Sequence, residues 1–252
     1  MDNNYSIVEN CTLPSKRTIY NPVVDPEIEI RSMTTVEEMK RMSTTDQQYK
    51  LMSEIIDSCI VKGPELSSYD MCIGDYQFLL YKLRTVTYGS EYSFDCTCPY
   101  CRNINKEKIS LDDFPVKEFS KSIEKYTQCD LPKTKQHVEL KLQTPRDLDL
   151  ITQEVKEFTK KTNNKQGDPA MIFTLRSAIY SVDGQQLDPI QLEDWIKKLP
   201  MRDTNYLIAY LNKLNTCIGV DTDLHCTCNL CGLEYDSPFR ITNEFFRPEI
   251  DI

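Results

Sequence analysis

The 252-residue chain is poor in several features on which enzymes and membrane proteins depend. It has only two histidines, His137 and His225, and its seven glycines form no glycine-rich phosphate loop and no Gly-x-Ser-x-Gly motif. No stretch approaches the roughly 20 apolar residues that a membrane-spanning helix needs. His225 directly precedes Cys226, so we expect a strand residue or a spare metal ligand there and not a catalytic base. These absences predict a non-enzymatic protein that has no membrane partner.

Positive charge is also scarce. The chain has 30 Lys and Arg against 39 Asp and Glu, which gives a net charge of −9 at pH 7. A phosphate backbone is attracted by basic surfaces, so this balance disfavours a general electrostatic grip on nucleic acid. Acidic residues, namely Glu91, Asp95, Asp221, Asp223 and Glu234, flank the cysteine motifs described next and would repel phosphate. We therefore expect no nucleic-acid partner.

Eleven cysteines stand out in a chain of otherwise ordinary composition. The first residues, Met-Asp-Asn-Asn-Tyr, contain neither the basic segment nor the apolar run of a secretory leader. Cysteine-rich chains without such a leader reside in reducing compartments, where disulfides are rare. We therefore expect free thiols that bind metal or pack in a core.

One six-residue motif, Cys-Thr-Cys-x-x-Cys, occurs at 96–101 and again at 226–231, which is 226 − 96 = 130 residues later. A Cys-x-x-Cys pair places two thiolates on one tight knuckle, and two such pairs complete a tetrahedral ligand set for Zn²⁺. Small buried cysteines of a core are the alternative interpretation. The repeated motif predicts one structural zinc site built from Cys98, Cys101, Cys228 and Cys231.

The outer cysteines of the two motifs, Cys96 and Cys226, leave three alternatives open. If each motif begins on a strand, residues 96 and 98 point to the same face. The outer cysteines could then pack in the core, or they could replace one of the four ligands. Six thiolates could also hold two metal ions by sharing sulfurs, which we rank last.

The pattern of apolar residues predicts an α+β fold, mostly helical, with short strands and zinc-ribbon knuckles. We expect an extended N-terminal arm at 1–26 and two halves, 27–130 and 131–252, that form one compact unit. Alternation predicts strands at 28–31, 92–94, 104–111 and 138–141. Helical spacing predicts helices at 35–59 with a break at 43–46, and at 75–88, 145–162, 171–180, 192–199 and 206–214.

The two halves share short sequence features. Ile28-Glu-Ile-Arg31 matches Val138-Glu-Leu-Lys141 at an offset of 138 − 28 = 110 residues. Gly89 and Gly219 each lie seven residues before a Cys-Thr-Cys. These matches predict a tandem pseudo-repeat in which each half contributes one knuckle, so that the zinc clamps the halves together.

Cys98-Pro-Tyr-Cys101 resembles the active-site motif of glutaredoxins, in which the first cysteine opens a helix that lowers its thiol pKa. The residues that follow Cys101 alternate like a strand, and the second motif lacks the Pro-Tyr pair. A thiol–disulfide oxidoreductase therefore ranks below a structural metal site. A zinc-ribbon protein that binds nucleic acid is the other alternative, and the net charge disfavours it.

Several short stretches resemble the baseplate hub assembly proteins of T-even-like contractile-tailed bacteriophages. They are Leu13-Pro-Ser-Lys16, Ile28-Glu-Ile-Arg-Ser-Met-Thr-Thr35, Tyr88-Gly89, Cys228-Asn-Leu-Cys231-Gly232 and Phe239-Arg-Ile-Thr-Asn-Glu-Phe-Phe-Arg-Pro248. The resemblance spans Leu13 to Pro248 and implies a non-enzymatic protein that helps to build the baseplate hub or forms part of it. It also implies other hub and tail proteins as partners, and the host cytoplasm or the virion tail as the location.

Both ends of the chain carry residues that could contact such a partner. Free tails are usually polar, yet Phe246 and Arg247 lie near the C-terminus, and aromatic residues and Arg are the types that anchor interfaces. We expect them to bind a partner together with Leu13 and Tyr20 of the arm. The alternative is that the C-terminal rings cover the protein's own ribbon.

Overall fold

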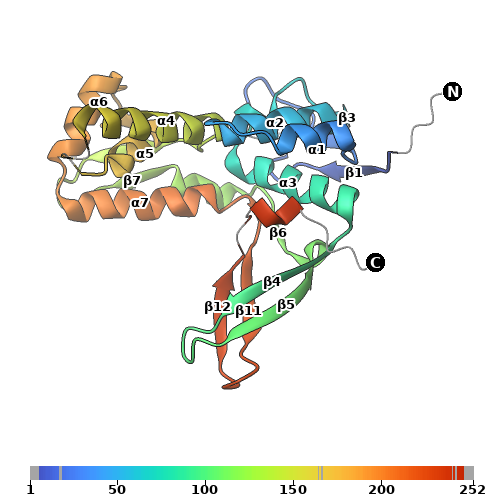
Figure 1. Ribbon diagram of the computed structural model, residues 1–252. Helices are drawn as coiled ribbons and strands as arrows, with labels where there is room; N and C mark the ends of the chain where they lie inside the picture. Colours follow the sequence, from blue (N-terminus) through green and yellow to red (C-terminus); the bar gives the residue numbers. More distant parts are fainter. Residues whose placement is uncertain are drawn as a thin grey trace.

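The computed structural model of the chain describes residues 6–16, 19–163, 165, 167–239, 241 and 243–246. Figure 1 shows a body of helices and small sheets from which two β-hairpins project together. The fold mixes helices and strands, as the sequence predicts. Within the described part of the chain, no helix combines the length and the apolar character that crossing a bilayer requires.

The first half is built around a three-stranded antiparallel sheet in the order β1-β2-β3. Ile28 and Ile30 of its central strand are buried, while Glu27, the first residue of the strand, is exposed, as the period-two pattern predicts. The elements of this half are β1 (Val8–Thr12), β2 (Glu27–Arg31), α1 (Thr35–Arg41), α2 (Gln48–Cys59), β3 (Ile60–Lys62), η1 (Ser68–Asp70), α3 (Ile73–Tyr88), β4 (Glu91–Thr97) and β5 (Ile104–Ser110).

The second half contains a sheet of the same kind, in the order β7-β8-β9. Short elements lead into it: η2 (Leu111–Asp113), β6 (Val116–Lys117), η3 (Lys121–Tyr126) and β7 (Gln128–Asp130). The remainder comprises β8 (His137–Leu140), α4 (Pro145–Thr162), α5 (Ala170–Ala178), β9 (Ile179–Val182), α6 (Pro189–Lys198), α7 (Met201–Asn215), β10 (Gly219–Val220), β11 (Asp223–Thr227), β12 (Glu234–Pro238) and η4 (Asn243–Phe246).

The central strands of the two sheets share an irregularity. The pairing of β2 with β3 shifts register between Glu29 and Ile30, and the pairing of β8 with β9 shifts between Glu139 and Leu140. These positions are 110 residues apart. Each central strand also leads into a helix that opens with a capping box, at Thr34 and at Thr144, which satisfies backbone donors of the first turn.

The turns after β1 and β7 are alike as well. Each begins with a Leu-Pro pair whose leucine, Leu13 or Leu131, is fully buried. A buried aspartate at the third position of a later helix then caps the turn. Asp75 of α3 accepts the backbone N–H of Ser15 at 3.0 Å, and Asp203 of α7 accepts the backbone N–H of Lys133 at 2.8 Å.

Buried apolar residues form three clusters, one in each half and a small one between the projecting hairpins. The C-terminal Phe239, Phe245 and Phe246 pack in the cluster of the first half. The buried guanidinium of Arg84 in α3 donates to the carbonyl oxygen of Phe245 at 2.9 Å. The end of the chain therefore returns to the core formed by its beginning.

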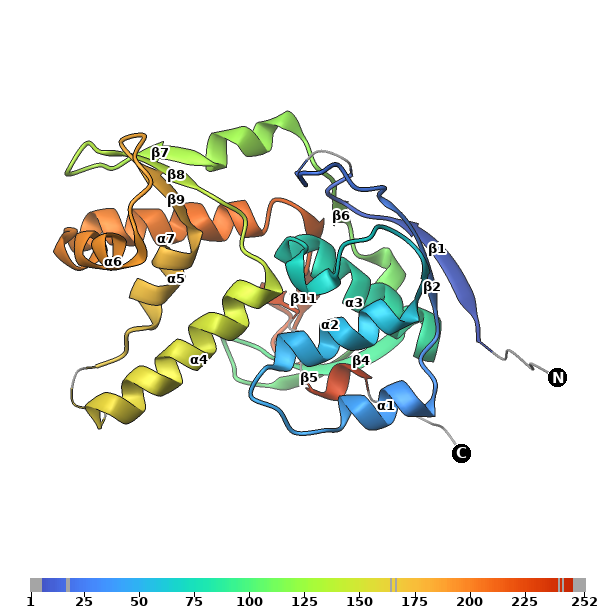
Figure 2. The ribbon, with the colours of Figure 1, turned by 90° about the horizontal axis from the view of Figure 1, so that it is seen from above.

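Polar contacts join the two halves where α4 meets α2 (Figure 2). Asp149 of α4 accepts the backbone N–H groups of Tyr49 and Lys50, at 3.3 and 2.8 Å, and so caps the first turn of α2. A carboxylate there also interacts favourably with the helix dipole. One half therefore supplies the helix cap of the other.

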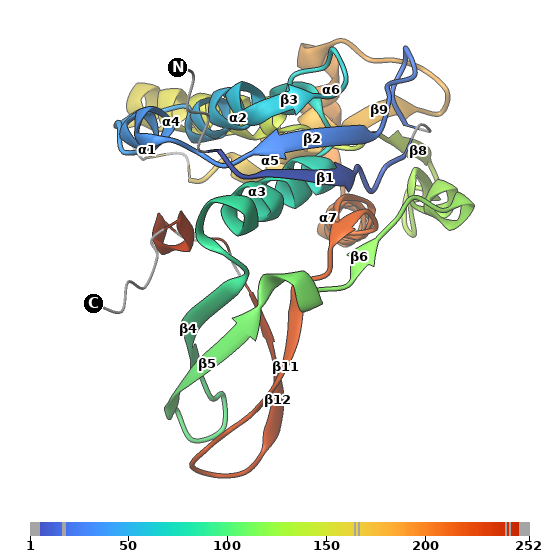
Figure 3. The same cartoon turned by 90° about the vertical axis from the view of Figure 1, so that its right-hand side faces the viewer.

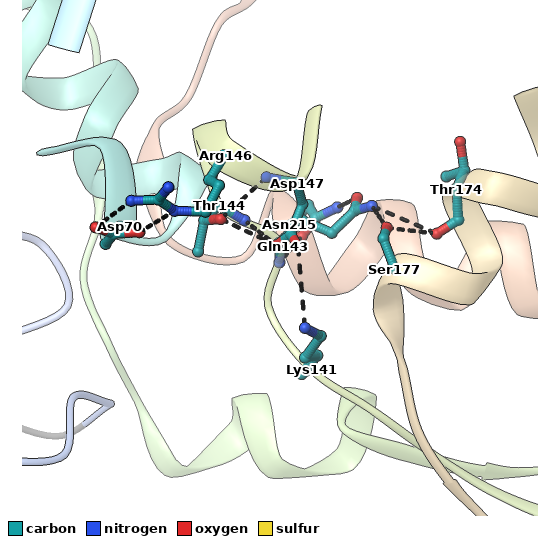
Figure 4. Close-up of polar contacts among 9 residues, drawn as sticks. All are labelled: Asp70, Lys141, Gln143, Thr144, Arg146, Asp147, Thr174, Ser177 and Asn215. Carbon is teal, nitrogen blue, oxygen red and sulfur yellow. Dashed lines mark hydrogen bonds and ion pairs between the residues drawn. The ribbon is translucent and has the colours of Figure 1, made fainter. Parts of the chain in front are cut away.

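A second set of contacts surrounds the start of α4 (Figure 4). Arg146 forms two hydrogen bonds with Asp70, at 2.6 and 2.9 Å, and lies over the ring of Tyr69. Gln143 accepts from the side-chain amide of Asn215 at 2.8 Å, which ties the chain before α4 to the end of α7. The backbone N–H of Ile73 donates to the carbonyl of Gln143 at 3.0 Å, a further link between the halves.

The structure corrects several boundaries. Residues 8–12 of the expected arm form an edge strand of the first sheet and Leu13 lies in its core, because Cys11 and Leu13 supply apolar surface. Residues 128–130, which the sequence assigned to the first half, form strand β7 and pair with β8 of the second. The helix expected to reach Tyr180 ends at Ala178, because Ile179–Val182 pairs with β8 instead.

Candidate metal centre

Two knuckles with the same backbone geometry lie at the ends of the projecting hairpins β4-β5 and β11-β12. In the first, the N–H of Arg102 donates to the carbonyl of Cys98 and the N–H of Cys98 donates to the carbonyl of Asn103, both at 2.9 Å. In the second, the N–H of Gly232 donates to the carbonyl of Cys228 at 2.9 Å. The residue after the last cysteine has positive φ in both, 62° at Arg102 and 71° at Gly232.

These turns bring four thiols together, two from each half of the chain. The Sγ atoms of Cys98 and Cys231 are 3.8 Å apart, those of Cys101 and Cys228 are 3.5 Å apart, and all four lie within 4.8 Å of one another. A tetrahedral site with Zn–S bonds of about 2.3 Å needs sulfurs about 3.8 Å apart. A disulfide needs about 2.05 Å, and all four cysteines are free. The group therefore fits a tetrahedral metal ion.

Two thiols of this group, those of Cys228 and Cys101, differ in acidity. The backbone N–H of Cys231, helped by that of Leu230, lowers the pKa of Cys228 to about 6. A hydrogen bond with the backbone of Asn103 lowers the pKa of Cys101. Desolvation and the neighbouring thiols outweigh it and raise this pKa to about 12. The thiolate of Cys228 therefore forms readily, whereas a metal ion must displace the proton of Cys101, so binding releases protons.

The outer cysteines pack between the hairpins. Cys96 and Cys226 are buried together with Cys98, Cys228 and Tyr235, and the Sγ of Cys96 lies 3.7 Å from the Oγ of Ser237. They are not members of the four-thiol group that the described residues form. Burial raises the pKa of Cys226 to about 11, which disfavours its thiolate. Of the alternatives left open by the sequence, this arrangement favours core packing.

A polar network beside the thiols was not predicted from the sequence. The buried side chain of Asn105 donates to the hydroxyl of Tyr235 at 3.0 Å and accepts the backbone N–H of Asn229 at 2.9 Å. It therefore joins the first hairpin to the second without metal. Asn105 and Tyr235 lie 235 − 105 = 130 residues apart, the offset of the cysteine motifs, but their residue types give no signal of the contact.

The structure also bears on the glutaredoxin-like motif. In the described chain, Cys101 is followed by a turn and by β5, whereas a redox motif of that kind opens a helix. Cys98 is fully buried and so is poorly placed to attack a disulfide. This geometry favours metal binding over thiol–disulfide exchange.

The expected partner-contact residues lie largely inside the protein. Leu13 is fully buried, Phe246 is 4 % exposed, and the hydroxyl of Tyr20 donates to Asp75 at 2.6 Å. Leu13 and Phe246 therefore do not offer their side chains to a partner, because the first core uses them. Arg247 lies outside the described residues. The rings of Phe245 and Phe246 pack in the core of the first half, whereas the alternative placed them over the ribbon.

Comparison with known families decides the relationship. A model of the T4 bacteriophage base plate protein family matches residues 6–247, nearly the whole chain. The chain belongs to this family. No curated protein and no solved structure matched it. The resemblance to baseplate proteins predicted from short motifs is therefore confirmed, and this base plate protein carries a four-cysteine group between its two halves.

Proposed function

We propose that this chain is a non-enzymatic tail protein that assists assembly of the baseplate hub, or forms part of it, through contacts with other hub and tail proteins. Structural Zn²⁺ holds its two halves together. It acts in the host cytoplasm while tails are built, and the baseplate of the virion is the second location that fits this role.

The family match over residues 6–247 carries this proposal. Baseplates are assemblies of many proteins, so a base plate protein functions by binding others. The narrower assignment to the hub rests on the stretches around Leu13, Ile28 and Phe245 that resemble hub assembly proteins. The acidic net charge of −9 supports protein partners over nucleic acid.

Zinc is the ion that suits the four thiols best. Thiolate ligands in a tetrahedral set select Zn²⁺ or iron–sulfur chemistry, and closed four-cysteine sites of this kind are structural. Cys98 and Cys231, whose sulfurs face each other, are 133 positions apart in the sequence, and Cys101 and Cys228 are 127 positions apart. The ion would therefore close a long loop. Long-loop closure removes much of the freedom of the unfolded chain and so stabilises the fold.

The matching features of the halves support a tandem duplication. They comprise the two three-stranded sheets, the register shifts at Glu29 and Glu139, and the capping boxes at Thr34 and Thr144. The two knuckles complete the set. In such an ancestry a metal site shared by two copies arises naturally, because each copy needs to supply only one Cys-x-x-Cys pair.

The proposal is tested in a phage whose copy of this gene carries an early stop codon. A plasmid that supplies the wild-type chain should restore plaques, and tails from cells without it should lack complete baseplates in electron micrographs. Elemental analysis of the purified chain should give about one zinc per molecule. Normal baseplates in cells that lack the chain would refute an assembly or structural role, and a metal-free folded protein would refute the zinc site.

A further inference from the structure

The far end of the two hairpins exposes a group of large apolar side chains. Tyr100 and Leu230 lie between the cysteines of the two knuckles and are 63 % and 71 % exposed. Ile104 and Leu233 follow the knuckles and are 66 % and 49 % exposed. We call these four residues, together with Arg102, the tip surface. Figure 3 shows that the two hairpins project away from the body of the protein.

The two knuckle loops that form the tip surface carry less charge than the chain as a whole. Among residues 97–104 and 227–233, Arg102 is the only charged side chain, although charged residues make up 27 % of the whole chain. Interface cores show the same depletion, and Tyr and Arg are enriched among the residues that dominate binding energy. A solvated loop would be expected to carry more charge than this.

The backbone under the tip surface is held in place before any partner binds. Backbone hydrogen bonds at Cys98 and Cys228 fix the two knuckles. The side chain of Asn105, on the first hairpin, accepts the backbone N–H of Asn229 in the second knuckle. A partner would therefore lose little free energy in ordering the loops, which is the main benefit of a preorganised surface.

The size of the surface indicates what kind of contact it makes. The four apolar residues expose roughly 500 Å², if a fully exposed large side chain offers about 200 Å². A stable specific interface buries about 800 Å² on each partner, and smaller ones belong to transient complexes. The tip surface is thus large enough to anchor a transient contact and too small to hold a permanent one by itself.

We propose that the tip surface anchors this chain on another baseplate protein, in a transient contact made during assembly. The partner has an apolar pocket that receives Tyr100 and Leu230, and a carboxylate at its rim that pairs with Arg102. The class of partner rests on the proposed function, whereas the location and chemistry of the surface rest on the structure.

A photocrosslinker at the tip identifies the partner directly. The change Tyr100→p-benzoylphenylalanine is made in the full chain, which is supplied to cells infected with the phage that lacks it. The same residue at Met39, which is 70 % exposed on α1, serves as control. We expect position 100, and not position 39, to crosslink to a phage baseplate protein, within a peptide that contains Asp or Glu.

Other crosslinking outcomes would overturn the inference. They are products with nucleic acid, with a second copy of the chain, or with host proteins alone, the absence of any product, and equal yields from positions 100 and 39. A crosslink to a baseplate protein from position 39 alone would leave the proposed function intact and refute the tip surface. Normal baseplates without the chain would refute both.

Substitutions test the energetics of the same surface. The variant Tyr100→Ala/Leu230→Ala should bind the crosslinked baseplate protein at least about tenfold more weakly, while the matched variant Val36→Ala/Met39→Ala on α1 should bind normally. Both should retain zinc. Arg102→Glu should weaken binding, and a Lys in place of the partner's carboxylate should restore it. Equal binding by the two double variants, or no rescue of Arg102→Glu, would count against the anchor.

Discussion

The side-chain amide of Asn105 donates a hydrogen bond to the hydroxyl of Tyr235 at 3.0 Å, and the two residues occupy equivalent places in the two hairpins. Asn105 lies opposite Cys96 in the ladder of β4 and β5, and Tyr235 lies opposite Cys226 in that of β11 and β12. The hairpins are therefore joined by polar contacts of this kind as well as by the four thiols. The polar contact needs no metal, so it orients the thiols before an ion binds.

We predict that Asn105→Ala lowers the free energy of unfolding by about 2 kcal/mol, because it leaves the Asn229 N–H and the Tyr235 hydroxyl without their buried partner. Tyr235→Phe removes one hydrogen bond and should cost about 1 kcal/mol. Urea unfolding of the zinc-loaded proteins measures both. Equal stability of Asn105→Ala and the wild type would show that the pair contributes nothing.

The second prediction separates the inner cysteines from the outer ones. Cys98→Ser and Cys231→Ser should reduce bound zinc to well below one ion per chain and make the hairpins sensitive to protease, because structural sites need all four ligands. Cys96→Ala is the matched control and should retain zinc, since Cys96 packs beside the group without belonging to it. Zinc loss on Cys96→Ala, or its retention in a stable Cys98→Ser/Cys231→Ser protein, would contradict this assignment.

The inner cysteines were predictable because their ligand spacing is a local property of the sequence. Two identical motifs indicated four thiols, and alternation around residues 92–94 and 104–111 indicated the hairpin that carries the first knuckle. Contacts between distant segments were not predictable in the same way. No local pattern shows that Asp149 caps α2, or that Phe245 returns to α3.

The N-terminal segment was misjudged for a related reason. Pro14, Pro22 and Pro26 exclude a helix, and that is compatible both with a free arm and with an edge strand. Only tertiary packing distinguishes the two, since Leu13 gains its apolar neighbours from other parts of the first half. The aspartate that holds its turn, Asp75, is sixty residues away.

A third prediction concerns a close backbone approach between the halves. A Cβ atom on Gly74 of α3 would lie 2.3 Å from the carbonyl oxygen of Ile218, which no shift of a side chain relieves. Gly74→Ala should therefore destabilise the protein, although alanine is favoured over glycine in a helix by about 1 kcal/mol. Gly63→Ala is the control, because the atoms nearest to its Cβ would belong to side chains, those of Ile60 at 3.0 Å and Ile28 at 3.5 Å, and not to the backbone. Thermal unfolding that is unchanged in Gly74→Ala would refute this close contact.

The capping glutamate of α1 gives a pH-dependent prediction. Burial raises the pKa of Glu37, but hydrogen bonds from Arg31 and Thr34 outweigh it and lower the pKa to about 2. A carboxyl with a depressed folded-state pKa stabilises the fold above its unfolded pKa, and this contribution is lost as the pH falls toward the folded value. Glu37→Gln should therefore destabilise the protein at pH 7 and much less at pH 3.

Urea unfolding of Glu37→Gln and of the wild type, compared at each pH, measures this difference. The comparison cancels the effect of acid on the four-cysteine group, because both proteins have it. A difference between the two proteins that stays constant from pH 7 to pH 3 would show that the carboxylate charge of Glu37 contributes nothing.

The last prediction follows from the placement of Phe245. Its ring lies fully buried, 5.2 Å from the ring of Tyr81 and 5.6 Å from that of Tyr92, and its carbonyl accepts from Arg84. Phe245→Ala should lower the free energy of unfolding by about 3–5 kcal/mol, because it leaves a cavity in the first core. Phe245→Leu should cost less, since it fills most of that volume.

Truncation after Asn243 extends the same test to the two C-terminal rings. It removes both rings and the carbonyl oxygen to which Arg84 donates. We therefore expect the shortened chain to be less stable than the wild type, and this loss of stability alone would keep it out of baseplates. Circular dichroism during urea unfolding measures the stability of the truncated chain. A truncated chain that unfolds cooperatively at the wild-type midpoint, yet fails to enter baseplates, would show that the C-terminal rings act on a partner and not in the core.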